Sequence, residues 1–280
     1  MNSKLNELLT RSLTGLIFVV LVILAIFIHP WAAGFLFLII TVLSLHEFYN
    51  LASAGSIKPY KVSGIMSGAG LFICFFIYGY TGGEIRLFPY LFILLLIIAS
   101  EGLFRRTKYF PNTAITLTGI LYTALPLALM NLFLFPLHNE MRYTPCIAAG
   151  YFIILWSFDT GAYVTGKPLG KHKMVPVISP AKSWEGFAGG IIIAAVVCYV
   201  TGTYYTVLSR IDWYVMLLMI IILGTAGDLF ESVLKRNAGV KDSGTLMPGH
   251  GGVLDRFDSV FFSLPVFAMY YLIKYKLICC

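Results

Sequence analysis

Charged residues are scarce in this sequence. Asp, Glu, Lys and Arg make up 12% of its 280 residues, whereas a soluble domain carries about 25%. Apolar residues make up 59%, and the mean hydropathy is +0.84. This imbalance excludes an ordinary soluble domain and predicts a polytopic membrane protein, whose size follows from its number of spans.

Several motifs are also lacking. The five cysteines show no CxxC or Cys/His spacing, which argues against a disulfide framework or a zinc site. No basic stripe with interleaved aromatic residues indicates a nucleic-acid partner. His46-Glu47 lacks the second histidine of HExxH, and there is no GxSxG and no DGxxAR pattern of membrane CDP-alcohol phosphotransferases. The segment 161–167 has Walker A glycines and lysine, but Pro168 replaces the Ser/Thr that would bind Mg²⁺, so a P-loop is rejected.

Nine apolar segments predict an all-α fold with about nine transmembrane helices. The first resembles a signal peptide, but further spans follow at once without a convincing cleavage site, so we expect an uncleaved span. A straight span needs about 20 residues, and the shorter segments are expected to lean on their neighbours. The segments lie near 13–29, 31–50, 63–80, 87–103, 113–134, 145–164, 186–205, 213–235 and 255–273.

The basic residues predict the orientation. With the N-terminus in the cytoplasm, 15 of the 20 Lys and Arg residues fall in cytoplasmic segments and 5 outside, as the positive-inside rule favours. Both long polar loops, near 165–185 and 236–254, then face the cytoplasm. We expect residues 1–140 to form a membrane scaffold and residues 141–280 to carry a catalytic site.

The eighth segment ends in an unusually polar helix. Asp228, Ser232 and Lys235 follow i, i+4, i+7 spacing, which places them on one helix face. Gly224 and Gly227 would let another helix or a ligand approach closely. Charged residues inside a membrane are costly and tend to mark function. A carboxylate that is merely neutralised by a nearby lysine is the alternative.

The ninth segment opens with HGGVLDRFD. Asp255 and Asp258 share one helix face, and Gly251-Gly252 would expose backbone N–H groups to a ligand at a helix N-terminus. If the last two helices are neighbours, Asp228 can meet Asp255, and close carboxylates repel unless a cation lies between them. Oxygen ligands near phosphate indicate Mg²⁺. Simple helix capping with a surface Asp–Arg pair is the alternative.

Further polar groups flank these helices. Asp159 lies late in the sixth segment, and Ser179-Pro180 resembles a helix start that would hold phosphate through Ser179 and Lys182, with plain capping as the alternative. The basic, glycine-rich loop 236–254 suits a polyphosphate, although it could merely fix topology. His250 in that loop could donate to phosphate or simply be solvated. Glu47 and Glu101 are interpreted as interfacial.

The C-terminal signature closely resembles that of the phosphatidate cytidylyltransferases, or CDP-diacylglycerol synthases. Two further blocks, SPAKSWEG at 179–186 and DTGAY at 159–163, resemble those of the same family. Ala181 departs from the usual Lys, so one phosphate contact is missing or comes from Lys171 or Lys173, and Met247 replaces the usual Leu. The matching positions of the signature are Ser232, Lys235, Arg236, Lys241, Asp242, Gly244, Pro248, Gly249, His250, Gly251, Gly252, Asp255, Arg256 and Asp258.

The resemblance implies that CTP and phosphatidate react to give CDP-diacylglycerol and diphosphate at the cytoplasmic face of a bacterial inner membrane. It implies that Asp228 and Asp255 hold Mg²⁺, and that a second cation such as K⁺ shares the site. Two rival functions remain: an ion-coupled transporter and a lipid or polyprenol kinase. A homodimer is conceivable from the unassigned apolar faces. The residues implied to bind or act on the substrates are Asp159, Lys171, Ser179, Lys182, Asp228, Ser232, Lys235, Arg236, Lys241, His250, Asp255 and Asp258.

Overall fold

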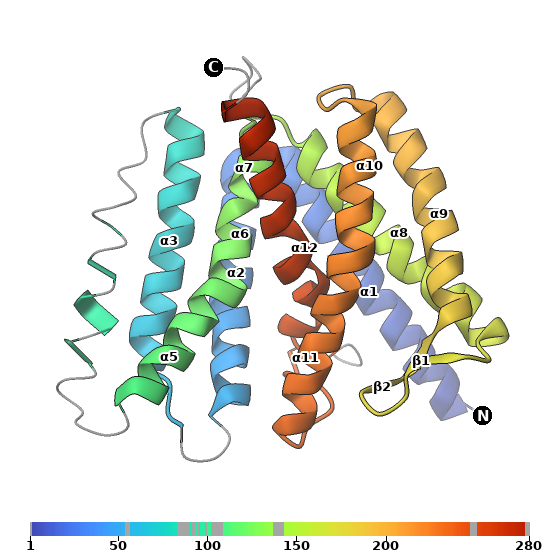
Figure 1. Ribbon diagram of the computed structural model, residues 1–280, viewed down its shortest axis with the longest axis horizontal. Coiled ribbons are helices and arrows are strands. Elements are labelled where there is room, and N and C mark those ends of the chain that lie inside the picture. The colour runs from blue at the N-terminus through green and yellow to red at the C-terminus, as the bar shows by residue number, and fades with distance from the viewer. Residues whose placement is uncertain are drawn as a thin grey trace.

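The protein is a bundle of long helices that run side by side from one end of the molecule to the other (Figure 1). The computed structural model describes residues 2–53, 57–82, 90, 93–94, 96–98, 100–101, 109–136, 143–246 and 251–277. The helices of the first half are α1 (Asn2–Ile28), α2 (Pro30–Ala52), α3 (Lys61–Thr81), α5 (Tyr109–Gly119), α6 (Leu125–Leu129) and α7 (Asn131–Leu134). Those of the second half are α8 (Cys146–Leu169), α9 (Trp184–Tyr204), α10 (Arg210–Met219), α11 (Thr225–Asn237) and α12 (Leu254–Leu272).

Three π-helical turns interrupt these helices. They are Ile120–Ala124 between α5 and α6, Ile220–Gly224 between α10 and α11, and Ile273–Leu277 after α12. The first two lie within continuous spans, 110–134 and 210–237. A π-turn adds a residue to a helical turn and is frequent at functional sites. The second of these turns ends four residues before Asp228 on α11.

The prediction of an all-α membrane protein is confirmed. Within the described residues, seven helical stretches are long and apolar enough to cross a membrane, and α1 adds a shorter apolar run, Leu13–Ile28. The predicted segment 87–103 lies largely outside the described residues, so the count of nine stays a prediction. Large apolar side chains also cover outward faces, such as Ile192, Val196 and Val200 on α9, which is expected where lipid replaces water.

The polar segment between α8 and α9 differs from the expected helix start. It forms an antiparallel hairpin of β1 (Lys173–Val175) and β2 (Ser179–Ser183), in which Lys173 pairs with Ser183 and Val175 with Ser179. Helix α9 begins only at Trp184, because the Ser183 side chain accepts a hydrogen bond from the backbone N–H of Gly186 at 3.2 Å. Ser183 is therefore the N-cap, and the interpretation of Ser179-Pro180 as the first helical turn is wrong.

The chain termini help to place the site. In Figure 1 the hairpin, the C-terminal end of α11 and the described N-terminus lie toward the same end of the bundle, and the C-terminus lies at the opposite end. Both long polar segments of the sequence therefore share one end of the molecule.

Candidate active site

Close packing of α11 on α12 positions the first acidic group. A Cβ added to Gly227 would lie 2.5 Å from the backbone carbonyl oxygen of Asp258, and one added to Gly224 would lie 3.3 Å from the Cβ of Ser259. Only glycine allows this separation at position 227, as expected for small residues between membrane helices. The contact brings Asp228 on α11 toward Asp258 on α12.

Lys182 joins the hairpin to this helix pair. Its Nζ lies 2.6 Å from Oδ2 of Asp228, and the Ser232 hydroxyl lies 3.4 Å from Oδ1 of the same carboxylate. Electrostatic interactions also connect Asp159 on α8 with Asp228, and Asp258 with both. Lys182 therefore contacts Asp228 directly, and Asp159 and Asp258 from two other helices lie close enough to interact with it electrostatically. We call Asp159, Lys182, Asp228 and Asp258 the hairpin-side cluster.

A second group of acidic side chains lies closer to the C-terminal end of α11. Lys235 Nζ lies 2.5 Å from Oδ1 of Asp255 and 3.1 Å from Oε2 of Glu231. The three side chains are 13%, 6% and 0% exposed, respectively, so this is a buried arrangement. Glu231 Oε1 is buried without a hydrogen-bond partner among the described residues. We call Glu231, Lys235 and Asp255 the loop-side cluster.

The structure gives each predicted metal ligand its own lysine: Asp228 pairs with Lys182, and Asp255 pairs with Lys235. The predicted i, i+4, i+7 face is present, and the lysine contact weighed as the alternative for Asp228 exists beside it. For Asp255 the alternative was helix capping with a surface Asp–Arg pair, whereas its Oδ1 contacts Lys235. Within the described residues, no three Asp, Glu, His or Cys side chains converge in a metal-binding group.

The oxygen-rich donor set nevertheless fits Mg²⁺. Acidic side chains outnumber the lysines in both clusters, and Oε1 of Glu231 accepts no hydrogen bond from the described chain. Mg²⁺ usually takes one or two protein carboxylates, with water and substrate phosphates completing its shell. A complete cage of protein ligands is therefore not the expected geometry for Mg²⁺.

Backbone and hydroxyl donors fix the orientation of Asp255. Its Oδ2 accepts from the N–H of Ser243 at 2.9 Å, the hydroxyl of Ser243 at 2.8 Å and the N–H of Gly252 at 2.8 Å. Gly251 adopts φ of 81°, and a Cβ there would lie 2.5 Å from the same oxygen. Glycine is therefore required at position 251 for backbone conformation and for space.

Glu47 was interpreted as interfacial, but the structure buries it at the start of α12. Its carboxylate accepts from the N–H groups of Val253 at 3.0 Å and Leu254 at 2.8 Å, and from the Ser243 hydroxyl at 3.0 Å. We predicted that backbone N–H groups at this helix N-terminus would bind a ligand. The N–H groups of Val253 and Leu254 instead donate to the carboxylate of Glu47, so the prediction is corrected for these two groups. Nothing in local sequence spacing indicates a contact across about 200 residues, so sequence reasoning missed it.

The remaining predicted residues lie around the clusters. Ser179 is half-buried on β2, and Lys241 is exposed. The Arg236 guanidinium donates to the Val240 carbonyl at 3.4 Å, and the backbone N–H of Lys171 donates to Glu185 at 3.1 Å. His250 lies outside the described residues.

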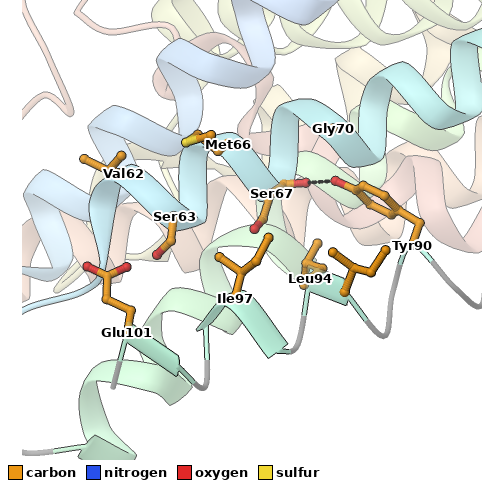
Figure 2. A pocket seen from close by; sticks show the side chains of 10 residues that line it. Val62, Ser63, Met66, Ser67, Gly70, Tyr90, Leu94, Ile97 and Glu101 are labelled. Carbon is orange, nitrogen blue, oxygen red and sulfur yellow. Dashed lines mark hydrogen bonds between the residues drawn. The ribbon is translucent and has the colours of Figure 1, made fainter. Parts of the chain in front are cut away.

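A cavity of about 540 Å³ lies elsewhere, between α3 and residues 90–101 (Figure 2). Its lining is mostly apolar and includes Met66, Leu94 and Ile97, with Glu101 near Val62. The Tyr90 hydroxyl donates to the carbonyl of Ser67 at 2.6 Å across it. Its lining includes no member of either acidic cluster, so this cavity is separate from the two clusters.

These features define an integral membrane protein with paired acid–lysine clusters at one end of its helix bundle. Residues 9–274 match the model of the cytidylyltransferase family, and the chain belongs to that family.

The chain is 34% identical over 263 residues to a phosphatidate cytidylyltransferase of Staphylococcus aureus, and the match covers 91% of this chain and 96% of the relative. A phosphatidate cytidylyltransferase from Staphylococcus saprophyticus is 35% identical over 229 residues, and the match covers 80% of this chain and 84% of the relative. A third phosphatidate cytidylyltransferase, from Staphylococcus haemolyticus, is 50% identical over 117 residues, and the match covers 41% of this chain and 45% of the relative. The predicted family resemblance is confirmed.

Proposed function

We propose that this chain is a phosphatidate cytidylyltransferase, which converts CTP and phosphatidate into CDP-diacylglycerol and diphosphate. The observation that carries the proposal is the pair of contacts Lys182–Asp228 and Lys235–Asp255, made between separate elements at one end of the bundle. Family membership and the names of the staphylococcal relatives support the choice of substrates.

In the proposed reaction, a phosphate oxygen of phosphatidate attacks the α-phosphorus of CTP. A new P–O bond forms, the bond from the α-phosphorus to the bridging oxygen breaks, and diphosphate leaves with that electron pair. A phosphate monoester loses its second proton with a pKa of about 6, so a strong general base is unnecessary. Positioning and neutralisation of charge provide most of the catalysis in such transfers.

The chain's own residues supply that neutralisation. Lys182 and Lys235 would exchange their carboxylate partners for phosphate oxygens, supported by Arg236 and Lys241. The hydroxyls of Ser179 and Ser232 would donate to phosphate or bound water. The remaining predicted substrate-binding residues are Asp159, Lys171 and His250, and Asp258 is assigned to the catalytic group.

Asp228 and Asp255 would hold Mg²⁺, with K⁺ as a candidate second cation. When bound, Mg²⁺ would offset the negative charge of the phosphates and of the diphosphate leaving group. The carboxylates themselves orient the lysines. Removing Mg²⁺ with a chelator is expected to stop turnover, and restoring Mg²⁺ is expected to recover it.

The location of the clusters suits an amphiphilic substrate. Acyl chains can stay beside lipid-facing helices, while the phosphate reaches a water-soluble nucleotide at the end of the bundle. The excess of Lys and Arg at that end supports a cytoplasmic active site. In a bacterium, the corresponding membrane is the inner one.

Purified protein in mixed micelles provides the test. With phosphatidate and Mg²⁺, we expect release of diphosphate from CTP, with ATP, GTP and UTP compared in parallel. Asp228→Asn and Asp255→Asn are expected to abolish release while the protein remains folded. Formation of a nucleoside diphosphate instead would identify a lipid kinase, and ion flux without nucleotide turnover would identify a transporter. Near-normal activity in either variant would refute the metal assignment.

A further inference from the structure

Glu47 lies far from the C-terminal signature in sequence but in contact with it in space. It is on α2, in the half of the chain expected to be scaffold, and is 7% exposed. Its two oxygens accept hydrogen bonds from Ser243, Val253 and Leu254, which are 196 to 207 residues away in the chain. One side chain therefore joins the first half of the molecule to both ends of the described part of the 243–254 loop.

The loop is built around this carboxylate. A Cβ added to Gly244 would lie 2.5 Å from Glu47 Oε1, and one added to Gly252 would lie 2.2 Å from Oε2. A larger residue at either position would force the Glu47 carboxylate to move, so the two glycines leave space for this acidic side chain where it lies. Two of its donors are also the otherwise unpaired N–H groups at the start of α12, where a negative charge is favourable.

The contact continues to Asp255. The Ser243 hydroxyl lies 3.0 Å from Glu47 and 2.8 Å from Asp255. A hydroxyl has one hydrogen, so the two carboxylates share a single donor. Asp255 in turn holds Lys235 at 2.5 Å. Fixing Ser243 and the first turn of α12 therefore fixes the direction of Asp255 and of the lysine it holds.

We propose that Glu47 is a positioning residue, which holds Ser243 and the start of α12 so that Asp255 and Lys235 face the substrates. This role rests on the proposed cytidylyltransferase function. Glu47 itself touches no reacting atom. The role gives the N-terminal half a direct part in the active site.

Glu47→Gln is the decisive variant because it preserves shape and changes one acceptor oxygen into a donor. Val253 and Leu254 donate to different oxygens, so one of these N–H groups must then face an NH₂. Loss of a supporting partner around a reactive site commonly costs about 10- to 100-fold in activity. We expect kcat to fall by that factor, with KM for CTP changed less than about threefold.

Glu101→Gln is the matched control. It makes the same chemical change in a glutamate at the end of another predicted span, beside the cavity of Figure 2. We expect wild-type kcat from it. Wild-type kcat in Glu47→Gln, or an equal loss in Glu101→Gln, would overturn the proposal.

Amide hydrogen exchange separates positioning from loss of activity for other reasons. Glu47→Gln should speed exchange at Val253 and Leu254 while leaving the melting temperature in detergent near that of wild type. Unchanged exchange at these amides would overturn the proposal. If wild-type protein releases no diphosphate from CTP, the proposed function fails, whereas the exchange experiment still tests whether Glu47 holds the loop.

Ser243→Ala provides a second route if Glu47→Gln does not accumulate in the membrane. It removes only the shared hydroxyl and leaves the backbone donors to Glu47 and Asp255 in place. We expect a fall in kcat of roughly 3- to 10-fold. Where Glu47→Gln does accumulate, the fold loss of kcat in the double variant should be smaller than the product of the two single losses, because both act through one contact. If the losses of kcat multiply fully, or if Ser243→Ala keeps wild-type kcat, then Glu47 does not act on Asp255 through the Ser243 hydroxyl.

Discussion

Two glycines about one turn apart, Gly224 at the end of the π-helical turn and Gly227 on α11, allow the close packing on α12 to be tested by itself. Gly227→Ala would place a Cβ 2.5 Å from the Asp258 carbonyl oxygen and 3.3 Å from the Cβ of Phe262. Gly224→Ala would place one 3.3 Å from the Cβ of Ser259, with its carbonyl oxygen at 3.7 Å. The first contact is with backbone, which cannot rotate away, so the helices must separate by roughly 0.5–1 Å in a close-packed interior.

The pair of variants cancels the effect of helix propensity. Each replacement gains up to about 1 kcal/mol from the preference of alanine over glycine within a helix. Overpacking costs about 1–3 kcal/mol, and only Gly227→Ala should suffer it in full. We therefore expect Gly227→Ala to be less stable than Gly224→Ala by about 1–3 kcal/mol.

Thermal unfolding in detergent at one fixed heating rate measures this difference. For a chain of this size, 1 kcal/mol corresponds to roughly 2–4 °C in Tm, so a gap of several degrees is expected. Gly227→Ala should also lose most diphosphate release, since a displacement of about 1 Å at a reacting site can cost 100-fold. Equal melting temperatures, or a lower one for Gly224→Ala, would refute the packing argument.

Three further variants test other contacts. Lys235→Met should lower the free energy of unfolding by about 3–5 kcal/mol, because it leaves Glu231 and Asp255 as buried carboxylates without their lysine. A lower Tm in detergent measures this loss of stability. Asp212→Ala should cost a similar amount in the same assay, because this fully buried carboxylate accepts hydrogen bonds from two tyrosines, a serine and a lysine near the C-terminal end of α12. It should leave the exchange of Val253 unchanged, since it lies at the opposite end of the bundle. Ser183→Ala should cost about 1 kcal/mol through loss of the α9 cap, seen as faster amide exchange in the first turn of α9.

Each of these expectations has a clear contrary result. A wild-type Tm in Lys235→Met would mean that its carboxylates are neutral or solvated without it. A wild-type Tm in Asp212→Ala would mean that the tyrosine and lysine contacts contribute little. Unchanged exchange after Ser183→Ala would remove its role as the cap.

Hydropathy and helical spacing were sufficient to predict the membrane class and the shared face of Asp228 and Lys235. Both signals are local, because they depend only on the order of residues along one helix. The glycines at 224 and 227 likewise predicted a close neighbour, and α12 is that neighbour. These features follow from sequence because a single element determines them.

Contacts between distant elements were harder to predict. Ser179 and Ser183 are both reasonable helix caps, and the cross-strand pairing with Lys173 decided between them. Glu47 resembles any glutamate at a membrane boundary until the N–H groups of α12 are placed beside it. The lysine partners of Asp228 and Asp255 also depend on tertiary packing, which spacing along the chain does not encode.

The carboxylate at the start of α12 has a consequence for recognition. Many nucleotide sites grip anions with rigid main-chain amides, but here two such amides are already committed to Glu47. Under the proposed function, an incoming triphosphate must therefore be received by the ammonium groups of Lys182 and Lys235, which leave their aspartates to do so. The vacated aspartates become available to a cation, so nucleotide and metal should each raise the affinity for the other, by the same factor in both directions.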